Sequence, residues 1–96
     1  MKNKYIKKSG IYCGTLLETT DDLNTITFGT YYSLNYSTPL NSPTGIYNYI
    51  VFVSIFGDYK LQILLCFNNS TIYYRFYSSG ISWRSWNKIN STAVNF

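Results

Sequence analysis

The chain has 96 residues, enough for one compact domain and no second one. Hydrophobic residues make up 46% of it and charged residues 12%, which is too apolar for a disordered chain. No apolar run reaches the roughly 20 residues of a membrane helix, and no apolar stretch follows the first lysines as it would in a signal peptide. We therefore expect a folded domain that does not insert into a membrane.

The residue types available exclude most catalytic chemistry. There is no histidine, so Ser–His–Asp and Cys–His arrangements and His-ligated metal sites are impossible. A zinc site would need more ligands than Cys13 and Cys66, and a two-carboxylate glycosidase would have to draw on four acids. These acids are Glu18, Asp21, Asp22 and Asp58. We expect no enzyme activity, no metal and no cofactor.

The net charge of +4 lies at the beginning of the chain. Half of the eight cationic residues fall within the first eight positions, and the other four balance the four acids. We predict a flexible basic arm over residues 1–10 and a single, neutral domain over 11–96. A neutral domain is not expected to bind nucleic acid. Cys13 and Cys66 can pair, but two buried thiols in a reducing compartment are the favoured interpretation.

The first half of the chain predicts irregular structure with two strands. Residues 11–17 and 27–34 are rich in strand-forming side chains. The polar segment 19–24 carries Thr and Asp residues that cap helices and predicts a short helical turn. Residues 35–45, which include two prolines and a glycine, predict a loop.

The second half predicts three regular strands joined by hairpins. The apolar, β-branched run 47–56 suits a strand covered on both sides. Gly57-Asp58 is a two-residue hairpin loop, and an alternating strand follows it over 59–67. Asn68-Asn69 is the next hairpin candidate because Asn tolerates positive φ.

The chain then predicts a third regular strand, over 71–77, in which the side chains again alternate. Residues 78–80 form a turn, and 81–89 is a last short segment that carries both tryptophans. The fold class predicted is all-β: a small antiparallel meander or sandwich knob with at most a short helical turn.

The candidate binding residues are aromatic and cationic side chains near the end of the chain. Tyrosine and tryptophan give rigid contact surface, stack on sugar rings and are common at interfaces, while arginine supplies hydrogen bonds. The alternative is that these aromatics are core residues and cross-strand pairs, which is favoured for Tyr74, Phe76 and Trp86. The candidates for ligand binding are Tyr73, Arg75, Tyr77, Trp83, Arg84 and Trp86.

The same stretch carries a resemblance to a known family. Its motifs are 72–76 (Ile-Tyr-Tyr-Arg-Phe), Gly80 and 83–89 (Trp-Arg-Ser-Trp-Asn-Lys-Ile), preceded upstream by 22–27, 29–32, 41–45 and Gln62. In order and spacing these resemble the pyocin-knob type domain at the distal end of R-type pyocin and phage tail fibres, over about residues 22–89. In that family Ser-Pro usually stands where Arg84-Ser85 stands here, and the knob usually ends a longer chain, whereas this sequence begins Met-Lys-Asn-Lys.

The resemblance implies a β-rich knob of a trimeric fibre, assembled in the bacterial cytoplasm and placed at the tail fibre tip of the virion. It implies a non-catalytic, receptor-binding function directed at a bacterial cell-surface glycan. It also implies that Tyr74, Arg75, Gly80 and Trp86 are mainly structural.

Three alternatives stay open. The chain can be a structural module that trimerises or caps a fibre without touching receptor. It can be a small free-standing phage protein that binds a host protein. It can also be a binder of single-stranded nucleic acid, which uses aromatic stacking and the lysine arm.

Overall fold

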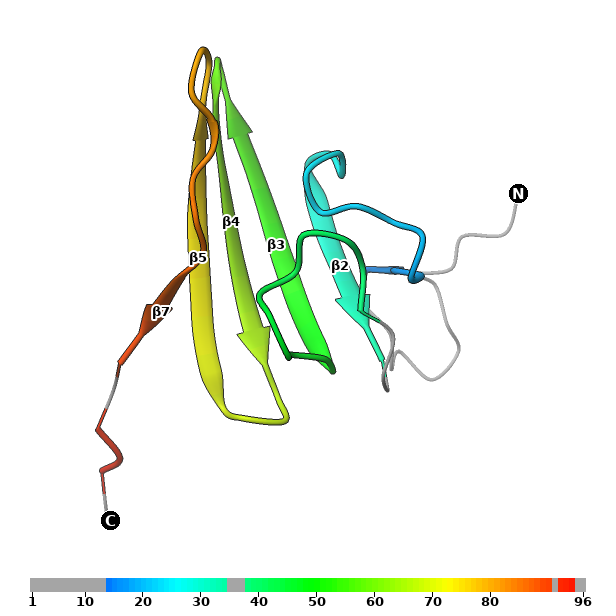
Figure 1. Ribbon diagram of the computed structural model, residues 1–96, viewed down its shortest axis with the longest axis vertical. Coiled ribbons are helices and arrows are strands. Elements are labelled where there is room, and N and C mark those ends of the chain that lie inside the picture. Colours follow the sequence, from blue (N-terminus) through cyan, green and yellow to red (C-terminus); the bar gives the residue numbers. More distant parts are fainter. Residues whose placement is uncertain (1–13, 35–37, 91, 95–96) are drawn as a thin grey trace.

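The computed structural model describes residues 14–34, 38–90 and 92–94, and these form one sheet of seven strands (Figure 1). The strands run in the order β1-β2-β3-β4-β5-β6, and β7 pairs with β5. Their bounds are β1 Thr15–Leu16, β2 Gly29–Ser33, β3 Tyr49–Phe56, β4 Tyr59–Cys66, β5 Thr71–Ser78, β6 Ser82–Trp83 and β7 Asn87–Ile89. The predicted all-β class is confirmed, with β2 to β5 as an antiparallel meander and β1 added in parallel to β2.

The three long strands are joined by two different turns. Gly57 adopts a φ of 62° and closes the two-residue loop between β3 and β4, as the sequence predicts. The predicted hairpin at Asn68-Asn69 is also present, but its turn takes four residues, 67–70, and the left-handed residue is Ser70 at a φ of 54° rather than an asparagine. The Phe67 N–H donates to Asn48 O (2.9 Å), which extends the pairing of β4 with β3 by one residue.

The segment 19–24 forms turns in place of the predicted helical turn. Asp21 N donates to Glu18 O, and Thr25 N donates to Asp22 O, both at 3.0 Å. The aspartate side chains also bind nearby backbone N–H groups: Asp21 Oδ2 accepts from Glu18 N (2.7 Å). Such local bonds stabilise turns in competition with helix, and no helix is present in the described residues.

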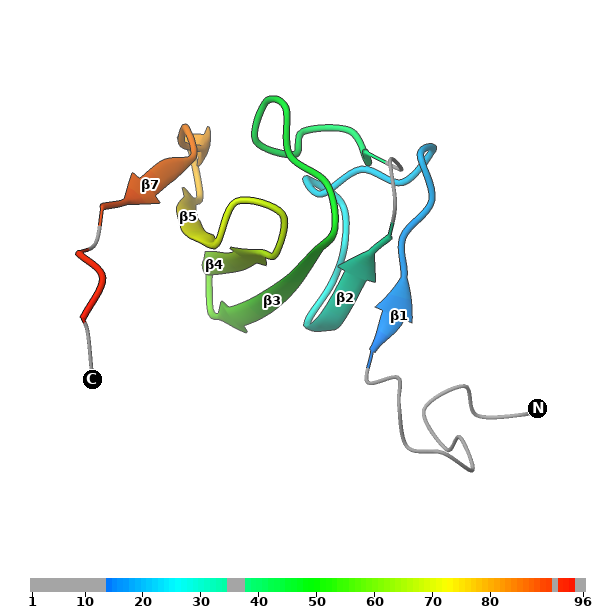
Figure 2. The same ribbon diagram turned by 90° about the horizontal axis from the view of Figure 1, so that it is seen from below.

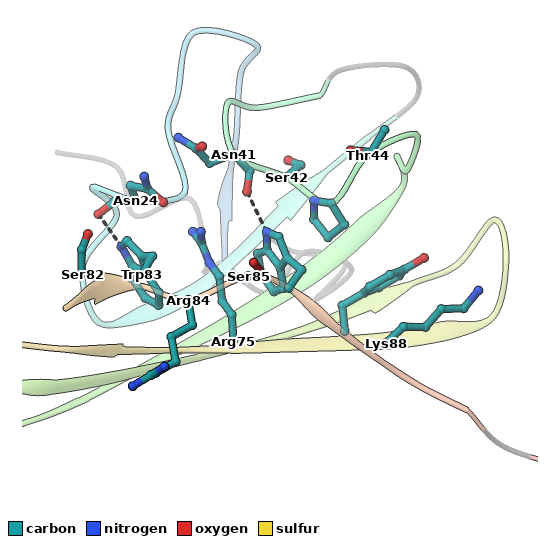
Figure 3. A pocket seen from close by; sticks show the side chains of 13 residues that line it. Asn24, Asn41, Ser42, Thr44, Arg75, Ser82, Trp83, Arg84, Ser85 and Lys88 are labelled. Carbon is teal, nitrogen blue, oxygen red and sulfur yellow. Dashed lines mark hydrogen bonds between the residues drawn. The ribbon is translucent and has the colours of Figure 1, made fainter.

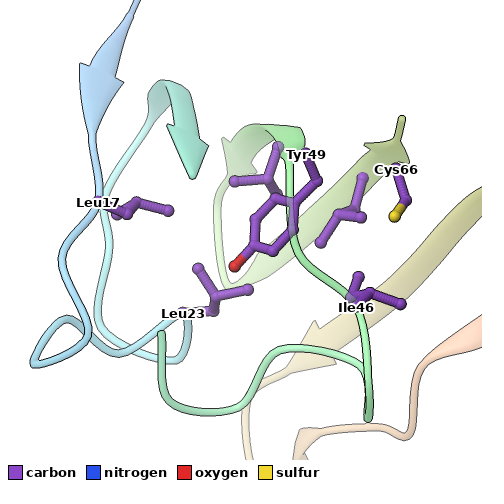
Figure 4. Close-up of a cluster of buried hydrophobic side chains, with 7 residues drawn as sticks. Leu17, Leu23, Ile46, Tyr49 and Cys66 are labelled. Atoms are coloured by element: carbon purple, nitrogen blue, oxygen red, sulfur yellow. The ribbon is translucent and has the colours of Figure 1, made fainter. Parts of the chain in front are cut away.

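The core lies on one side of the sheet. The loops that precede β2 and β3 gather on this side, the upper one in Figure 2, and pack against the strands. Figure 4 shows the cluster around the Tyr49 ring. Its members are Leu17, Leu23, Ile46, Tyr49, Val51, Leu64 and Cys66. We call this side the loop-covered face.

The other side of the sheet is exposed. The sequence predicts a strand over 47–56 that is covered on both sides, but Phe52 and Phe56 on β3 are 42% and 60% exposed. No described segment crosses this side, because both long loops turn toward the opposite face. We call it the bare face.

The cysteines, the predicted basic arm and membrane-spanning helices are considered next. Cys66 is a buried free thiol whose Sγ donates to Asn68 Oδ1 (2.9 Å), whereas Cys13 and the predicted arm over residues 1–10 lie outside the described residues. Within the described ranges, no helix has the length and apolar character needed to cross a membrane.

Candidate functional site

The site begins with a β-bulge opposite the middle of β5. Trp83 pairs with Tyr77 and Asn87 pairs with Tyr74, so three residues of the last segment face two residues of β5. In a regular strand, two tryptophans three positions apart would point to opposite faces of the sheet. The extra residue shifts the alternation and places Trp83 and Trp86 on the same, loop-covered face.

The two indole rings enclose Arg75 of β5. Its guanidinium carbon lies 4.2 Å from the ring centre of Trp83 and 4.5 Å from that of Trp86. Arg75 is only 4% exposed. Cation–π contacts of this kind contribute about 0.5–2 kcal/mol each when the cation is desolvated, so they offset part of the cost of burial.

A chain of hydrogen bonds connects Arg75, through Gln62 of β4, to the loop before β2. Arg75 Nε donates to Gln62 Oε1 (2.8 Å), and Gln62 Nε2 donates to the carbonyl of Leu23 (2.6 Å). Burial lowers the pKa of Arg75 to about 10, against the opposing charge of Asp22. The side chain therefore remains a buried cation at neutral pH.

Each indole N–H forms a hydrogen bond that connects the segment 83–86 to one of the two loops. Trp83 Nε1 donates to Asn24 O (3.3 Å), and Trp86 Nε1 donates to Asn41 O (2.8 Å) (Figure 3). The two loops are also joined directly, because Asp22 Oδ1 accepts from Asn41 Nδ2 (2.8 Å) and from Asn24 N (2.8 Å). Both bonds lower the pKa of the Asp22 carboxyl, and the bond from Asn41 has the larger effect.

Between these groups lies an open pocket of about 580 Å³. Its wall is made by the end of the chain, by β5 and by the two loops, and Figure 3 shows the side chains around it. The lining residues are Asn24, Asn41, Ser42, Pro43, Thr44, Tyr73, Arg75, Ser82, Trp83, Arg84, Ser85, Trp86 and Lys88. Three of them are cationic and none is acidic.

Two polar atoms of the pocket wall are buried without a hydrogen-bond partner among the described residues. They are Arg75 Nη2, a donor, and Asn24 Oδ1, an acceptor. Buried groups of this kind are rare in folded proteins, and each costs about 1–3 kcal/mol when left unpaired.

The structure brings most of the predicted candidates to this pocket. Five of the six line it. The sixth, Tyr77, packs against Trp83 with the rings tilted by 59° and their centres 5.4 Å apart, and the Lys60 ammonium lies 4.6 Å from the Tyr77 ring centre. The candidates in the wall are Tyr73, Arg75, Trp83, Arg84 and Trp86. Of these, only Arg84 is exposed, whereas Arg75 and both indoles are held by internal contacts.

Sequence reasoning did not place several residues of the site. Lys88 lines the pocket because β7 pairs it with Tyr73, and the loop residues Asn24, Asn41 and Ser42 come from positions far upstream. The odd spacing of the tryptophans was the available signal, since two large aromatics can share a strand face at that spacing only through a bulge.

No group of three or more potential metal ligands occurs in the described part of the chain. Comparison of the chain with family models, with curated proteins and with solved structures finds no match.

Proposed function

We propose that this protein is a non-catalytic receptor-binding knob of a phage or phage-like tail fibre, which recognises a bacterial cell-surface glycan. In this proposal three chains assemble at the fibre tip in the virion, and the pocket beside the bulge receives the glycan. The observation that carries the proposal is the composition of that pocket: aromatic rings, hydroxyl and amide groups, and cations gathered in one wall.

Saccharide recognition needs an apolar platform next to hydrogen-bonding groups. Each indole already presents one ring face to Arg75, so a sugar would use the remaining edges and the Tyr73 ring. Hydrogen bonds are offered by Ser82, Ser85 and the Asn24 amide. Pocket volumes of several hundred Å³ fit small-molecule ligands, and 580 Å³ lies in this range.

The charge of the wall narrows the type of glycan. Arg84 and Lys88 are exposed cations at the pocket, and Arg75 adds a buried one. We therefore propose a glycan that carries acidic groups, for which attraction falls as salt screens the charges.

The resemblance to tail-fibre knobs gains support from the contacts between its motifs. Residues 22–27, 41–45 and 83–89 lie far apart in the sequence, yet hydrogen bonds join all three around the pocket. Gln62, which also fits the motif set, bonds to the carbonyl of Leu23. One set of residues therefore explains both the sequence pattern and the shape of the site.

The test is binding of the purified protein to acidic envelope glycans from several bacteria, in low and high salt. The double variant Arg84→Ala, Lys88→Ala should weaken binding about five- to tenfold, because each exposed charge contributes less than about 1 kcal/mol. Lys60→Ala is the matched control, since Lys60 lies outside the pocket wall.

Equal binding by the double variant and the wild type would contradict the assignment of the pocket. Binding to single-stranded oligonucleotides in place of glycans would support the nucleic-acid alternative. A protein that assembles but binds none of these ligands would support the structural trimerisation or capping module.

A further inference from the structure

The bare face of the sheet is uncharged and mostly apolar. The registers of β2 to β7 place the outward side chains in continuous rows, one of which is Phe52, Ile63 and Tyr74. No charged residue stands among them. The full set is Thr30, Tyr32, Ile50, Phe52, Ser54, Phe56, Tyr59, Leu61, Ile63, Leu65, Ile72, Tyr74, Phe76, Ser78, Asn87 and Ile89.

In the single chain nine of these sixteen residues are exposed, and the other seven are half-buried. Phe52, Phe76 and Ile63 are 42%, 47% and 36% exposed although they lie on the three central strands. Their rings and methyl groups pack only on neighbours of the same face, as in the Tyr74–Phe76 pair at 5.6 Å. Antiparallel sheets that leave one face in water normally carry mostly polar residues on it, whereas most residues of this face are aliphatic or aromatic.

The size of the face matches a protein interface. Three eight-residue strands with the shorter strands beside them span on the order of 500 Å² of sheet, from a rise of about 3.4 Å per residue and a strand spacing of about 4.8 Å. Two such faces in contact remove on the order of 1,000 Å² from water, which reaches the lower bound of about 1,000 Å² for a specific interface.

The composition of the face favours another copy of this chain as its partner. A charged partner would find no opposite charge here, whereas a second uncharged face meets it without repulsion and excludes water equally on both sides. Apolar sheet faces pack on each other about 10 Å apart through interdigitated side chains. The sheet edges offer less backbone for pairing with another chain, because β1 and β6 have only two residues each and β7 has three.

We infer that the bare face is the surface on which copies of this chain associate. This inference rests on the assembly part of the proposed function and names the surface responsible. It places the pockets on the outside of the assembly, because the pocket and the bare face lie on opposite sides of the sheet.

The experiment is sedimentation of the full chain over a range of concentrations, with two variants. Ile63→Lys puts a charge at the centre of the bare face, and Leu40→Lys makes the same type of change at a 56% exposed position on the loop side. We expect the wild type and Leu40→Lys to sediment as trimers, the assembly in the proposed function; dimers would support the surface but contradict the assembly of three chains. Ile63→Lys should require at least tenfold higher concentration to associate, or remain a monomer.

Circular dichroism of dilute samples checks that Ile63→Lys is folded, and Phe76→Lys serves as a second variant if it is not. A wild-type assembly that both bare-face variants leave intact would overturn the assignment of the surface and leave the proposed assembly standing. A monomeric wild type would overturn both. Glycan binding, measured on the same samples, tests the pocket separately.

Discussion

The two faces of the sheet differ in a way that hydrophobicity alone does not predict. On β4 the outward residues Leu61, Ile63 and Leu65 are all apolar, whereas the inward set contains the fully buried Gln62. On β5 the inward residue at the centre is Arg75, and Phe76 beside it points to the bare face. Two large polar side chains, Gln62 and Arg75, are thus buried, and several apolar side chains point to the bare face.

The difference shows that the contacts available to a side chain, and not its polarity alone, determine whether it is buried on this sheet. Gln62 and Arg75 are buried because each finds a hydrogen bond or an aromatic ring at the required distance. The apolar residues of the bare face have no described segment above them. A buried polar network and an exposed apolar surface in one small domain indicate that each face serves a different contact.

The largest expected effect comes from removing the buried cation. Arg75→Ala leaves Gln62 Oε1 without its donor and both indoles without the guanidinium between them. We expect a loss of about 3–4 kcal/mol in the free energy of unfolding, measured by urea denaturation. Arg84→Ala, at an exposed position, should change it by less than about 0.5 kcal/mol. Equal effects of the two variants would contradict the structural role of Arg75.

Substituting a polar residue on one face and an apolar residue on the other compares how much each face contributes to the free energy of unfolding. Gln62→Leu keeps the size of the side chain but leaves Arg75 Nε and the Leu23 carbonyl unpaired, so we expect a loss of about 2–3 kcal/mol. Ile63→Gln, one residue along and on the bare face, should cost less than about 1 kcal/mol in dilute monomer. Chemical denaturation of both variants at low concentration measures the difference. A larger loss in Ile63→Gln would mean that the bare face stabilises the monomer.

Alkaline pH tests the loop-covered face through Tyr49. Burial raises the pKa of Tyr49 from 10.0 to about 12, while its hydroxyl bonds to Ser42 Oγ (2.6 Å). Because the folded state favours the neutral phenol, this stabilisation is present below pH 10 and is lost as the pH rises through 12. The loss amounts to about 2 kcal/mol.

The control for this prediction is Tyr49→Phe, in which Arg75 is unchanged. Stability of the wild type and of the variant should be measured by denaturation at several pH values between 9 and 12. The stability of the variant should fall less steeply across this range. Parallel curves would show that Tyr49 does not titrate abnormally.

The smallest predicted effect concerns the fastening of the loops. Trp86→Phe keeps an aromatic ring over Arg75 but removes the N–H that donates to Asn41 O at 2.8 Å. We expect a loss of about 1 kcal/mol, read as a lower thermal midpoint. Trp83→Phe, which loses a longer bond of 3.3 Å to Asn24 O, should lose less. The reverse order would contradict the account of how the loops are held.

The sequence was sufficient for the meander because its signals are local. The β-branched run before Gly57-Asp58 and the alternation that follows predict β3 and β4 close to their observed bounds. The hairpin before β5 was predicted at Asn68-Asn69, but its four-residue turn places the positive φ on Ser70.

The site was predictable only in part, because contacts between residues far apart in the sequence build much of it. Aromatic and cationic residues close together at the end of the chain indicated where a pocket would form. The bulge, the burial of Arg75 and the pairing of Asp22 with Asn41 arise from contacts across the fold. Nor did any local pattern indicate which side of the strands the loops would cover.

The most direct test of the account is hydroxyl-radical footprinting of the full chain at high and low concentration. Phe52 and Phe76 on the bare face should be oxidised slowly when concentrated and several-fold faster after dilution. Leu40, exposed on the loop side, should react at the same rate in both samples. This result would show that the bare face is covered by another copy while the loop side stays free. Phe52 and Phe76 reacting at rates that do not change with concentration would contradict the account.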